Sequence, residues 1–280
     1  MSAIRIGAVA AKFGRDLDFD LQRIATLIEH ARQSGVALLV LPDAALGGYL
    51  GDLHQPDPAG LPPALELDDP HVLKVAGLAA EMVVCFGFCE TDGNRRFNTA
   101  VCVHDGALLG SHRKVHQPAG ESIAYAAGER FGAFDTPVGQ LGMLIDYDKT
   151  FPESARTLAL DGAEVLACLS AWPTSVTNRA PRMAQDRQAR LFDLYDQARA
   201  AENQVVLVSS NQTGAQGQLR FLGQAKVVGP GGDILARTWS KAGIATAELD
   251  VAGEIAKARR VLRHLDERKP GVYRIGLIPG

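Results

Sequence analysis

The sequence predicts a mixed α/β fold in which sheets and helices form a layered sandwich. Short apolar runs typical of buried strands alternate with segments whose apolar residues recur at helical spacing. Several hairpin turns interrupt this alternation, and they favour a layered sandwich over a doubly wound parallel sheet. The 280 residues contain no repeat, low-complexity tract or long linker, so we predict one domain over residues 1–280.

The first half of the chain supplies strands and two helices in alternating order. Residues 17–34 carry an apolar helical face formed by Leu21, Ile24, Ile28 and Ala31. Gly35 then marks the end of this helix, and a shorter helix is predicted over residues 71–80. We expect loops at residues 51–63 and 122–131. The strands are predicted at residues 4–10, 36–41, 82–90, 99–104 and 107–114.

The second half begins with an apolar strand over residues 141–145, followed by a helix that starts after Pro152. Longer helices are predicted over residues 182–203 and 251–262, and an extended tail follows the second of them. The remaining strands are predicted at residues 165–169, 204–210, 221–223, 225–228, 234–237 and 244–249.

Composition excludes several classes of protein. The net charge of -3 gives no electrostatic footprint for nucleic acid. No apolar run approaches the ~18 residues of a membrane span, and the N-terminus lacks the pattern of a signal peptide. The four cysteines lie in apolar, strand-like runs, which indicates buried free thiols and a cytoplasmic protein with no metal site. Among them, Cys168 has the apolar surroundings of a core thiol.

The chain is organised around residues 139–164, where an apolar strand stops abruptly at Asp146 and a helix begins after a short turn. Such a junction can aim one side chain into a cleft, and free backbone N–H groups there can stabilise an oxyanion. We therefore predict that Asp146 faces a functional cleft.

This stretch closely resembles the nucleophile segment of the nitrilase, or carbon–nitrogen hydrolase, superfamily. That family reads roughly hydrophobic-Ile-Cys-Tyr-Asp-x-x-Phe-Pro-Glu, and its cysteine is the nucleophile. Asp146 stands where the cysteine belongs. The positions that match are Ile145, Tyr147, Asp148, Phe151, Pro152 and Glu153.

The resemblance covers nearly the whole chain, because further motifs follow in family order. It implies that Asp43 occupies the position of the general base, normally glutamate, and that Lys114 is the catalytic lysine. It also makes Glu121 the candidate for a second, substrate-positioning glutamate. The implied fold is an α-β-β-α sandwich that pairs into a four-layer homodimer or a higher homo-oligomer. The family acts on small amides and nitriles without a metal or an organic cofactor.

The family chemistry is thiol catalysis, and this sequence departs from it at two central positions. Asp43 keeps the carboxylate of the base but withdraws it by one methylene, roughly 1.5 Å. A carboxylate at position 146 is a poor nucleophile towards an amide. Ionised near its reference pKa of about 3.9, it also has no proton for Asp43 to take. The thioester route is closed in the sequence as it stands.

Replacing a thiol by a carboxylate also changes the charge of the site. Asp43, Lys114, Asp146 and Glu121 sum to a negative charge, which should raise the pKa of one carboxyl. We expect this pocket to favour an amine, a guanidinium or another cation over a neutral amide. Tyr49, Tyr147 and Trp172 are the candidates for walls that contact the ligand.

Three interpretations of Asp146 remain open. The first is natural divergence to an altered enzyme or to a non-hydrolase, such as a small-molecule-binding or partner-modulating protein. The second is an engineered inactivation of an amidase, and the third is catalysis of a different reaction. The second departure, at Asp43, favours natural divergence. An open pocket would indicate a ligand, and a pocket plugged by Trp172 or by residues 51–63 would indicate a scaffold. We interpret His112 and His116 as structural, and we expect Asp148 to bond backbone groups and an arginine.

Overall fold

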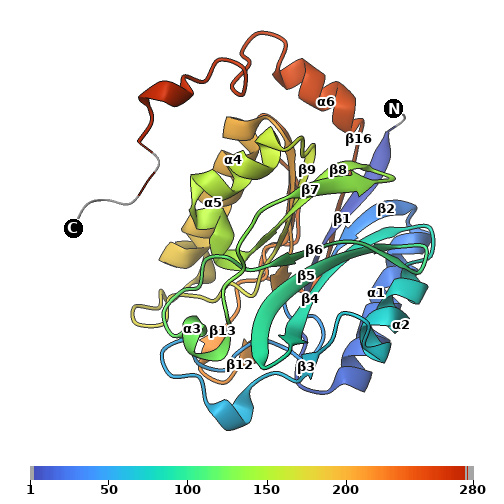
Figure 1. Ribbon diagram of the computed structural model, residues 1–280, viewed down its shortest axis with the longest axis vertical. Coiled ribbons are helices and arrows are strands. Elements are labelled where there is room, and N and C mark those ends of the chain that lie inside the picture. Colours follow the sequence, from blue (N-terminus) through green and yellow to red (C-terminus); the bar gives the residue numbers. More distant parts are fainter. Residues whose placement is uncertain (1–2, 275, 277–280) are drawn as a thin grey trace.

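The computed structural model describes residues 3–274 and 276, and its two large sheets lie between two pairs of helices (Figure 1). The first sheet has the strand order β11-β1-β2-β4-β5-β6, with β16 added beside β1 and β3 beside β4. Its strands are β1 (Ile4–Ala11), β2 (Val36–Val40), β3 (Ala64–Leu65), β4 (Val83–Asp92), β5 (Arg95–His104), β6 (Ala107–Arg113), β11 (Asn211–Gln212) and β16 (Gly243–Leu249). β1, β2 and β4 run parallel, whereas β4, β5 and β6 form an antiparallel meander.

The second sheet has the strand order β15-β14-β10-β9-β8-β7. Its strands are β7 (Ala133–Thr136), β8 (Gly139–Ile145), β9 (Val165–Leu169), β10 (Val206–Ser209), β14 (Lys226–Val228) and β15 (Ile234–Arg237). The central strands β8, β9 and β10 are parallel, and the outer pairs are antiparallel. A separate small hairpin joins β12 (Ala215–Gln216) to β13 (Leu219–Arg220).

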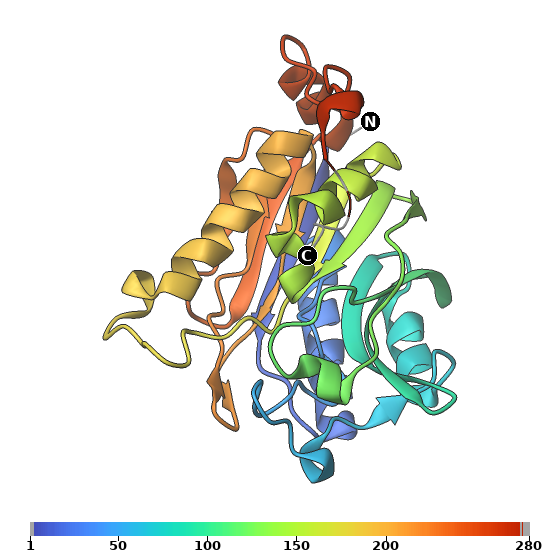
Figure 2. The same cartoon turned by 60° about the vertical axis from the view of Figure 1, so that its left-hand side comes forward.

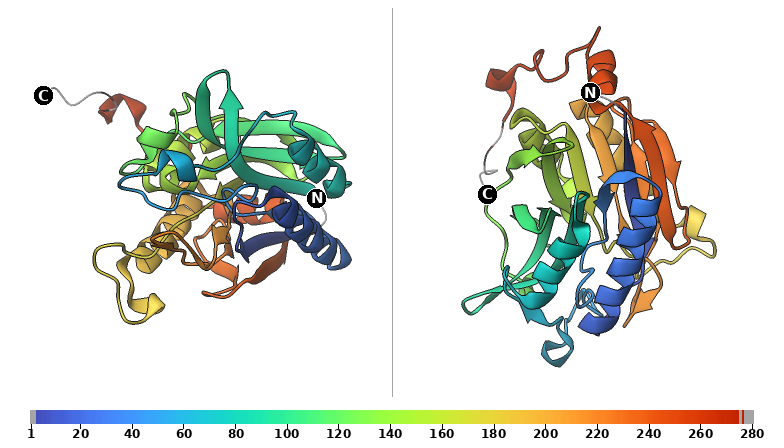
Figure 3. Two further views of the ribbon diagram at one scale, coloured as in Figure 1. Left: turned by 90° about the horizontal axis from the view of Figure 1, so that it is seen from below. Right: turned by 90° about the vertical axis from the view of Figure 1, so that its right-hand side faces the viewer.

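Helices cover the outer face of each sheet, as Figures 1 and 2 show. α1 (Leu17–Gln33) and α2 (Pro70–Ala79) cover the first sheet, and α4 (Pro152–Leu160) and α5 (Arg187–Asn203) cover the second. The other helices are α3 (Glu121–Ala124), α6 (Val251–Ala258) and the 3-10 turns Pro58–Gly60, Asp146–Thr150, Met183–Gln185 and Pro270–Val272. In Figure 3 the red segment that follows α6 lies outside the layers.

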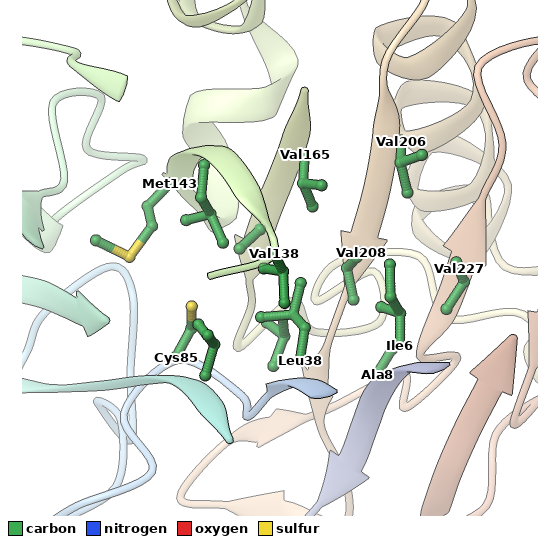
Figure 4. Close-up of a cluster of buried hydrophobic side chains, with 14 of the residues drawn as sticks. Ile6, Ala8, Leu38, Cys85, Val138, Met143, Val165, Val206, Val208 and Val227 are labelled. Carbon is green, nitrogen blue, oxygen red and sulfur yellow. The ribbon is translucent and has the colours of Figure 1, made fainter. Parts of the chain in front are cut away.

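The main hydrophobic core lies between the two sheets (Figure 4). It combines Ile6, Leu38 and Cys85 of the first sheet with Met143 and Val165 of the second. Separate apolar clusters lie beneath the two helix pairs. Each sheet is therefore buried on both faces, which explains why its central strands are apolar runs without strict alternation.

These layers confirm the predicted α-β-β-α sandwich, with differences at element ends. The helix predicted over residues 182–203 begins instead at Arg187, because Asp186 caps its first turn by accepting a hydrogen bond from the Gln188 N–H over 2.9 Å. The helix predicted over residues 251–262 ends at Ala258. The loop predicted over residues 122–131 starts inside the short helix α3, and residues 221–223 form only an isolated bridge, from Phe221 to Pro173. The predicted tail continues into residues 275 and 277–280, which lie outside the described residues.

None of the helices in residues 3–274 is long and apolar enough to cross a membrane.

Candidate active site

Asp146 lies where β8 ends and the 3-10 turn Asp146–Thr150 begins. Its backbone φ of 49° is in the left-handed region, which a non-glycine residue adopts only when its surroundings hold it there. The preceding Ile145 packs in the core between the sheets. The bend therefore separates Asp146 from the core and turns it towards the cavity that it lines.

Asp148 holds this turn in place. Its buried carboxylate accepts hydrogen bonds from the backbone N–H groups of Ile145 (3.2 Å), Val115 (3.2 Å) and His116 (2.9 Å). The rings of His112 and His116 each lie 2.9 Å from its oxygens. Burial raises the pKa of Asp148, but these hydrogen bonds outweigh burial and hold the pKa well below its usual range. The backbone bonds were predicted; the predicted arginine partner was wrong, and two histidines take its place.

Lys114 follows the edge strand β6 and is almost fully buried. Its Nζ lies 2.8 Å from Glu121 Oε2, 3.0 Å from Glu121 Oε1 and 3.3 Å from Asp146 Oδ2. Burial lowers the pKa of Lys114, and the attraction of Glu121, Asp146 and Asp43 reverses this and raises the pKa above its ordinary value. The ammonium is therefore charged and already shared between two carboxylates.

Glu121 is the first residue of α3 and has no exposed surface. Its Oε1 accepts a hydrogen bond from Tyr49 Oη (2.8 Å) and a longer one from Asn98 Nδ2 (3.4 Å). Burial raises the pKa of Glu121 and Lys114 lowers it, with a net rise. Tyr49 thus lies beside Glu121 as its hydrogen-bond donor and is itself buried.

Asp43 lies just beyond β2 and is also fully buried. Asn98 Nδ2 donates to Asp43 Oδ2 over 2.9 Å, and Asp43 Oδ1 has no hydrogen-bond partner. Burial raises the pKa of Asp43 to about 7, although Lys114 and Asn98 act in the opposite direction. Gly87 of β4 makes room for this segment, since a Cβ there would lie 2.9 Å from Asp43 Oδ1 and 2.8 Å from the next backbone nitrogen.

A cavity of about 290 Å³ opens over Asp146. Its described lining residues are Leu53, His54, Pro118, Ala119, Asp146, Tyr147, Trp172, Pro173, Thr174, Val176, Thr177 and Gln188. Trp172 is fixed by hydrogen bonds from its backbone N–H to Asn211 Oδ1 (2.8 Å) and from its indole N–H to Gln188 Oε1 (3.0 Å). Trp172 lines the cavity, as do Leu53 and His54 of the loop predicted over residues 51–63, and none of them fills it.

The structure brings Asp43, Lys114, Asp146 and Glu121 into one cluster. Tyr147 and Trp172 line the cavity, whereas Tyr49 and Glu121 do not line it and lie within the cluster. Cys168 lies in the apolar cluster beneath α4 and α5, and burial raises the pKa of its thiol to about 12, as the predicted core thiol requires.

Sequence reasoning did not single out Asn98, Thr174 or Gln188. Asn98 is a buried amide within β5, but it precedes the strand predicted at residues 99–104, so no sequence pattern marked it as buried. Thr174 and Gln188 belong to no motif.

Fold and site together define a class of protein, an α-β-β-α sandwich with a buried carboxylate–lysine cluster where several strands end. The chain belongs to the carbon–nitrogen hydrolase family, whose model matches residues 5–259.

Individual proteins of known sequence or structure are similar to this chain over most of its length. A nitrilase from Pyrococcus abyssi is 30% identical over 247 residues, covering 83% of this chain and 84% of that protein. An N-carbamoylputrescine amidase from Solanum tuberosum is 26% identical and covers 93% of this chain and 90% of its own length. A carbon–nitrogen hydrolase from Helicobacter pylori G27 superimposes with a TM-score of 0.85 at 25% identity over 97% of each chain. The resemblance inferred from the sequence motifs is confirmed for family and fold.

Proposed function

We propose that this chain binds a small molecule reversibly in the cavity over Asp146 and does not form the thioester intermediate of cysteine-dependent hydrolysis. One observation carries the proposal: Asp146 occupies the turn after β8, and its Oδ2 lies 3.3 Å from Lys114 Nζ. A carboxylate paired with that lysine offers neither a thiol nor a free ammonium for an oxyanion. The open cavity supports a ligand over a purely structural role.

The decisive experiment compares the native chain with Asp146→Cys and with the double variant Asp146→Cys, Asp43→Glu. Each is incubated with small aliphatic amides and nitriles, and both ammonia release and the intact protein mass are measured. We expect no turnover and no mass increase for the native chain, and an acyl adduct or turnover for at least the double variant. Asp146→Ser serves as a matched control of similar size without a thiol. An adduct on the native chain would refute the proposal.

A second candidate function is hydrolysis by a different route, with Asp43 as the base that activates a water molecule. It is favoured by the pKa of about 7 and by the unpartnered Oδ1 of Asp43. It predicts slow, thiol-independent turnover that rises with pH around 7 and is lost in Asp43→Asn. The absence of turnover across pH 6 to 8 would eliminate it.

We further propose that the chain is a cytoplasmic homodimer or higher homo-oligomer with a single domain. Exposed leucines on the two helices that flank the site support pairing there: Leu160 of α4 is 50% exposed and Leu194 of α5 is 57% exposed. Four free, buried cysteines are consistent with a reducing compartment. Light scattering on the native chain and on Leu194→Glu tests the pairing, which requires a dimeric mass that falls in the variant.

A further inference from the structure

We propose that the ligand of this cavity is a small organic monocation, an amine or amidine whose N–H groups bond Asp146 and Thr174. The inference rests on the proposed function and specifies the chemical class of the ligand. It starts from the charges that line the cavity. Among the described lining residues, Asp146 supplies the one carboxyl group, and the set contains no lysine or arginine.

Two buried polar atoms of the lining lack partners. Asp146 Oδ1 has no hydrogen bond, and Asp146 as a whole is 4% exposed. Thr174 Oγ1 is likewise unpartnered in a residue that is 7% exposed, although its backbone N–H bonds to Arg220 O over 2.7 Å. Buried polar atoms are normally satisfied, so such exceptions in a cavity wall indicate where a ligand bonds. A carboxylate oxygen accepts only, which selects an N–H or O–H donor.

The groups behind Asp146 reinforce this preference. Glu121 and Asp43 lie in the same buried cluster, and Lys114 is its one ammonium. Lys114 Nζ lies nearer to Glu121 (2.8 Å) than to Asp146 (3.3 Å), so its single charge is divided between them and does not fully offset Asp146, which leaves a negative potential at the cavity floor. Because the cluster is shielded from water, this potential is weakly screened by salt. A cation gains from it, and a neutral amide of the same shape does not.

The remaining walls suit the hydrocarbon part of such a ligand. The rings of Tyr147 and Trp172 line the cavity, and aromatic faces attract cations. Leu53, Pro118 and Val176 complete an apolar surface. At about 290 Å³, the cavity is at the small end of the ~300–1,000 Å³ typical of ligand sites. It therefore fits a compact cation better than a long polyamine.

The test compares benzamidinium with benzamide, two planar molecules of nearly equal shape that differ in charge. Calorimetric titration of the native chain at pH 7.5 should show benzamidinium binding at least about tenfold more tightly. Asp146→Asn keeps the shape of the side chain and removes its charge, and it should reduce the two affinities to within about twofold of each other. Thr174→Val should weaken benzamidinium about three- to tenfold. Glu81→Gln, which neutralises an exposed carboxylate outside the lining, should change neither affinity.

The outcomes separate the two proposals. Equal affinity for benzamide and benzamidinium on the native chain would overturn the cation inference and leave reversible binding intact. A preference that survives in Asp146→Asn would overturn the assigned anchor and with it the inference. No binding of either probe, or a covalent adduct with benzamide, would overturn both the inference and the proposed function. The comparison of benzamidinium with benzamide on the native chain tests the preference for a cation even if a variant fails to fold.

Discussion

Asn98 donates its side-chain amide to Asp43 over 2.9 Å inside the buried cluster. The same Nδ2 lies 3.4 Å from Glu121 Oε1, so one neutral side chain joins two carboxylates. Asn98 belongs to β5, whereas Asp43 follows β2 and Glu121 opens α3. A residue outside every motif therefore fixes the spacing of the acids around Lys114.

We expect Asn98→Asp to destabilise the protein in a pH-dependent manner. The variant keeps the shape of the side chain, removes the donor and adds a buried charge beside Asp43 and Glu121. Unfolding in urea should show a loss of about 2–3 kcal/mol at pH 8. The loss should be smaller at pH 5.5, where the carboxyls take up protons. Asn94→Asp makes the same change in an exposed turn and should alter the free energy of unfolding by less than about 0.5 kcal/mol. An equal loss at both pH values would contradict the charge argument.

The raised pKa of Asp43 predicts that its contribution to stability falls as pH rises. The folded carboxyl, with a pKa of about 7, holds a proton that the unfolded carboxyl, near 3.9, has already released. Its contribution is therefore complete below pH 4 and is lost as pH rises through 7. The groups that face it are Lys114, Asn98, Asp146, Glu121, Tyr49 and Tyr125.

The measurement is the free energy of unfolding of the native chain and of Asp43→Asn from pH 5 to pH 8. Relative to the variant, the native chain should lose on the order of 2–4 kcal/mol over this range. A difference that stays constant with pH would show that Asp43 is ionised throughout.

The layers were accessible from the sequence because they depend on strong local patterns, whereas the acid–lysine cluster was implied by the resemblance of its motifs to the nitrilase superfamily. Apolar runs such as residues 165–169 define strands that are buried on both faces. Asp43 and Asp146 follow predicted strands, and Lys114 is the last residue of one. What the sequence did not provide were contacts made across elements. Tyr49 was expected in the cavity wall, yet it donates to Glu121 behind the wall.

The start of α5 has the same kind of explanation. The carboxylate of Asp186 accepts from Ser175 N and Ser175 Oγ as well as from Gln188 N, so a contact with the preceding loop fixes where the helix begins. Periodicity alone extends that helix back towards Arg182.

Asp148→Asn should disorder the turn that carries Asp146. In the native chain, three backbone N–H groups donate hydrogen bonds to the Asp148 carboxylate. In the variant, the side-chain NH2 group replaces one acceptor oxygen and would face these donors without being able to accept from them. We expect a loss of about 3 kcal/mol at pH 7, because a buried hydrogen-bonded charge is removed. The stabilisation depends on a lowered pKa, so it is present above the unfolded pKa and is lost as pH falls below it. The deficit of the variant should therefore shrink below pH 4.

Thermal unfolding of Asp148→Asn and of Glu153→Gln checks this prediction. Glu153 is an exposed acid in the adjoining first turn of α4, and its neutralisation should have little effect. A comparable loss in both variants would assign the effect to net charge in this region and not to the turn.

Binding of benzamidinium should become tighter between pH 6 and pH 8, and it should release a proton. As pH passes the pKa of Asp43, near 7, a further negative charge appears in the cluster behind Asp146 and attracts the cation. By linkage, the bound cation must lower the pKa of Asp43, so binding below pH 7 expels part of a proton. The same carboxyl is faced by Glu121, Asp146, Lys114, Tyr49 and Tyr125. Lys114, Tyr49 and Tyr125 do not titrate between pH 6 and pH 8, because their pKa values are raised above their already high ordinary values. We expect an increase in affinity of about three- to tenfold.

Calorimetry in two buffers of different ionisation enthalpy measures both the affinity and the proton count. Asp43→Asn should bind with an affinity that is flat across this range, while Glu81→Gln keeps the slope of the native chain. A slope that persists in Asp43→Asn would contradict the assignment of the proton to Asp43.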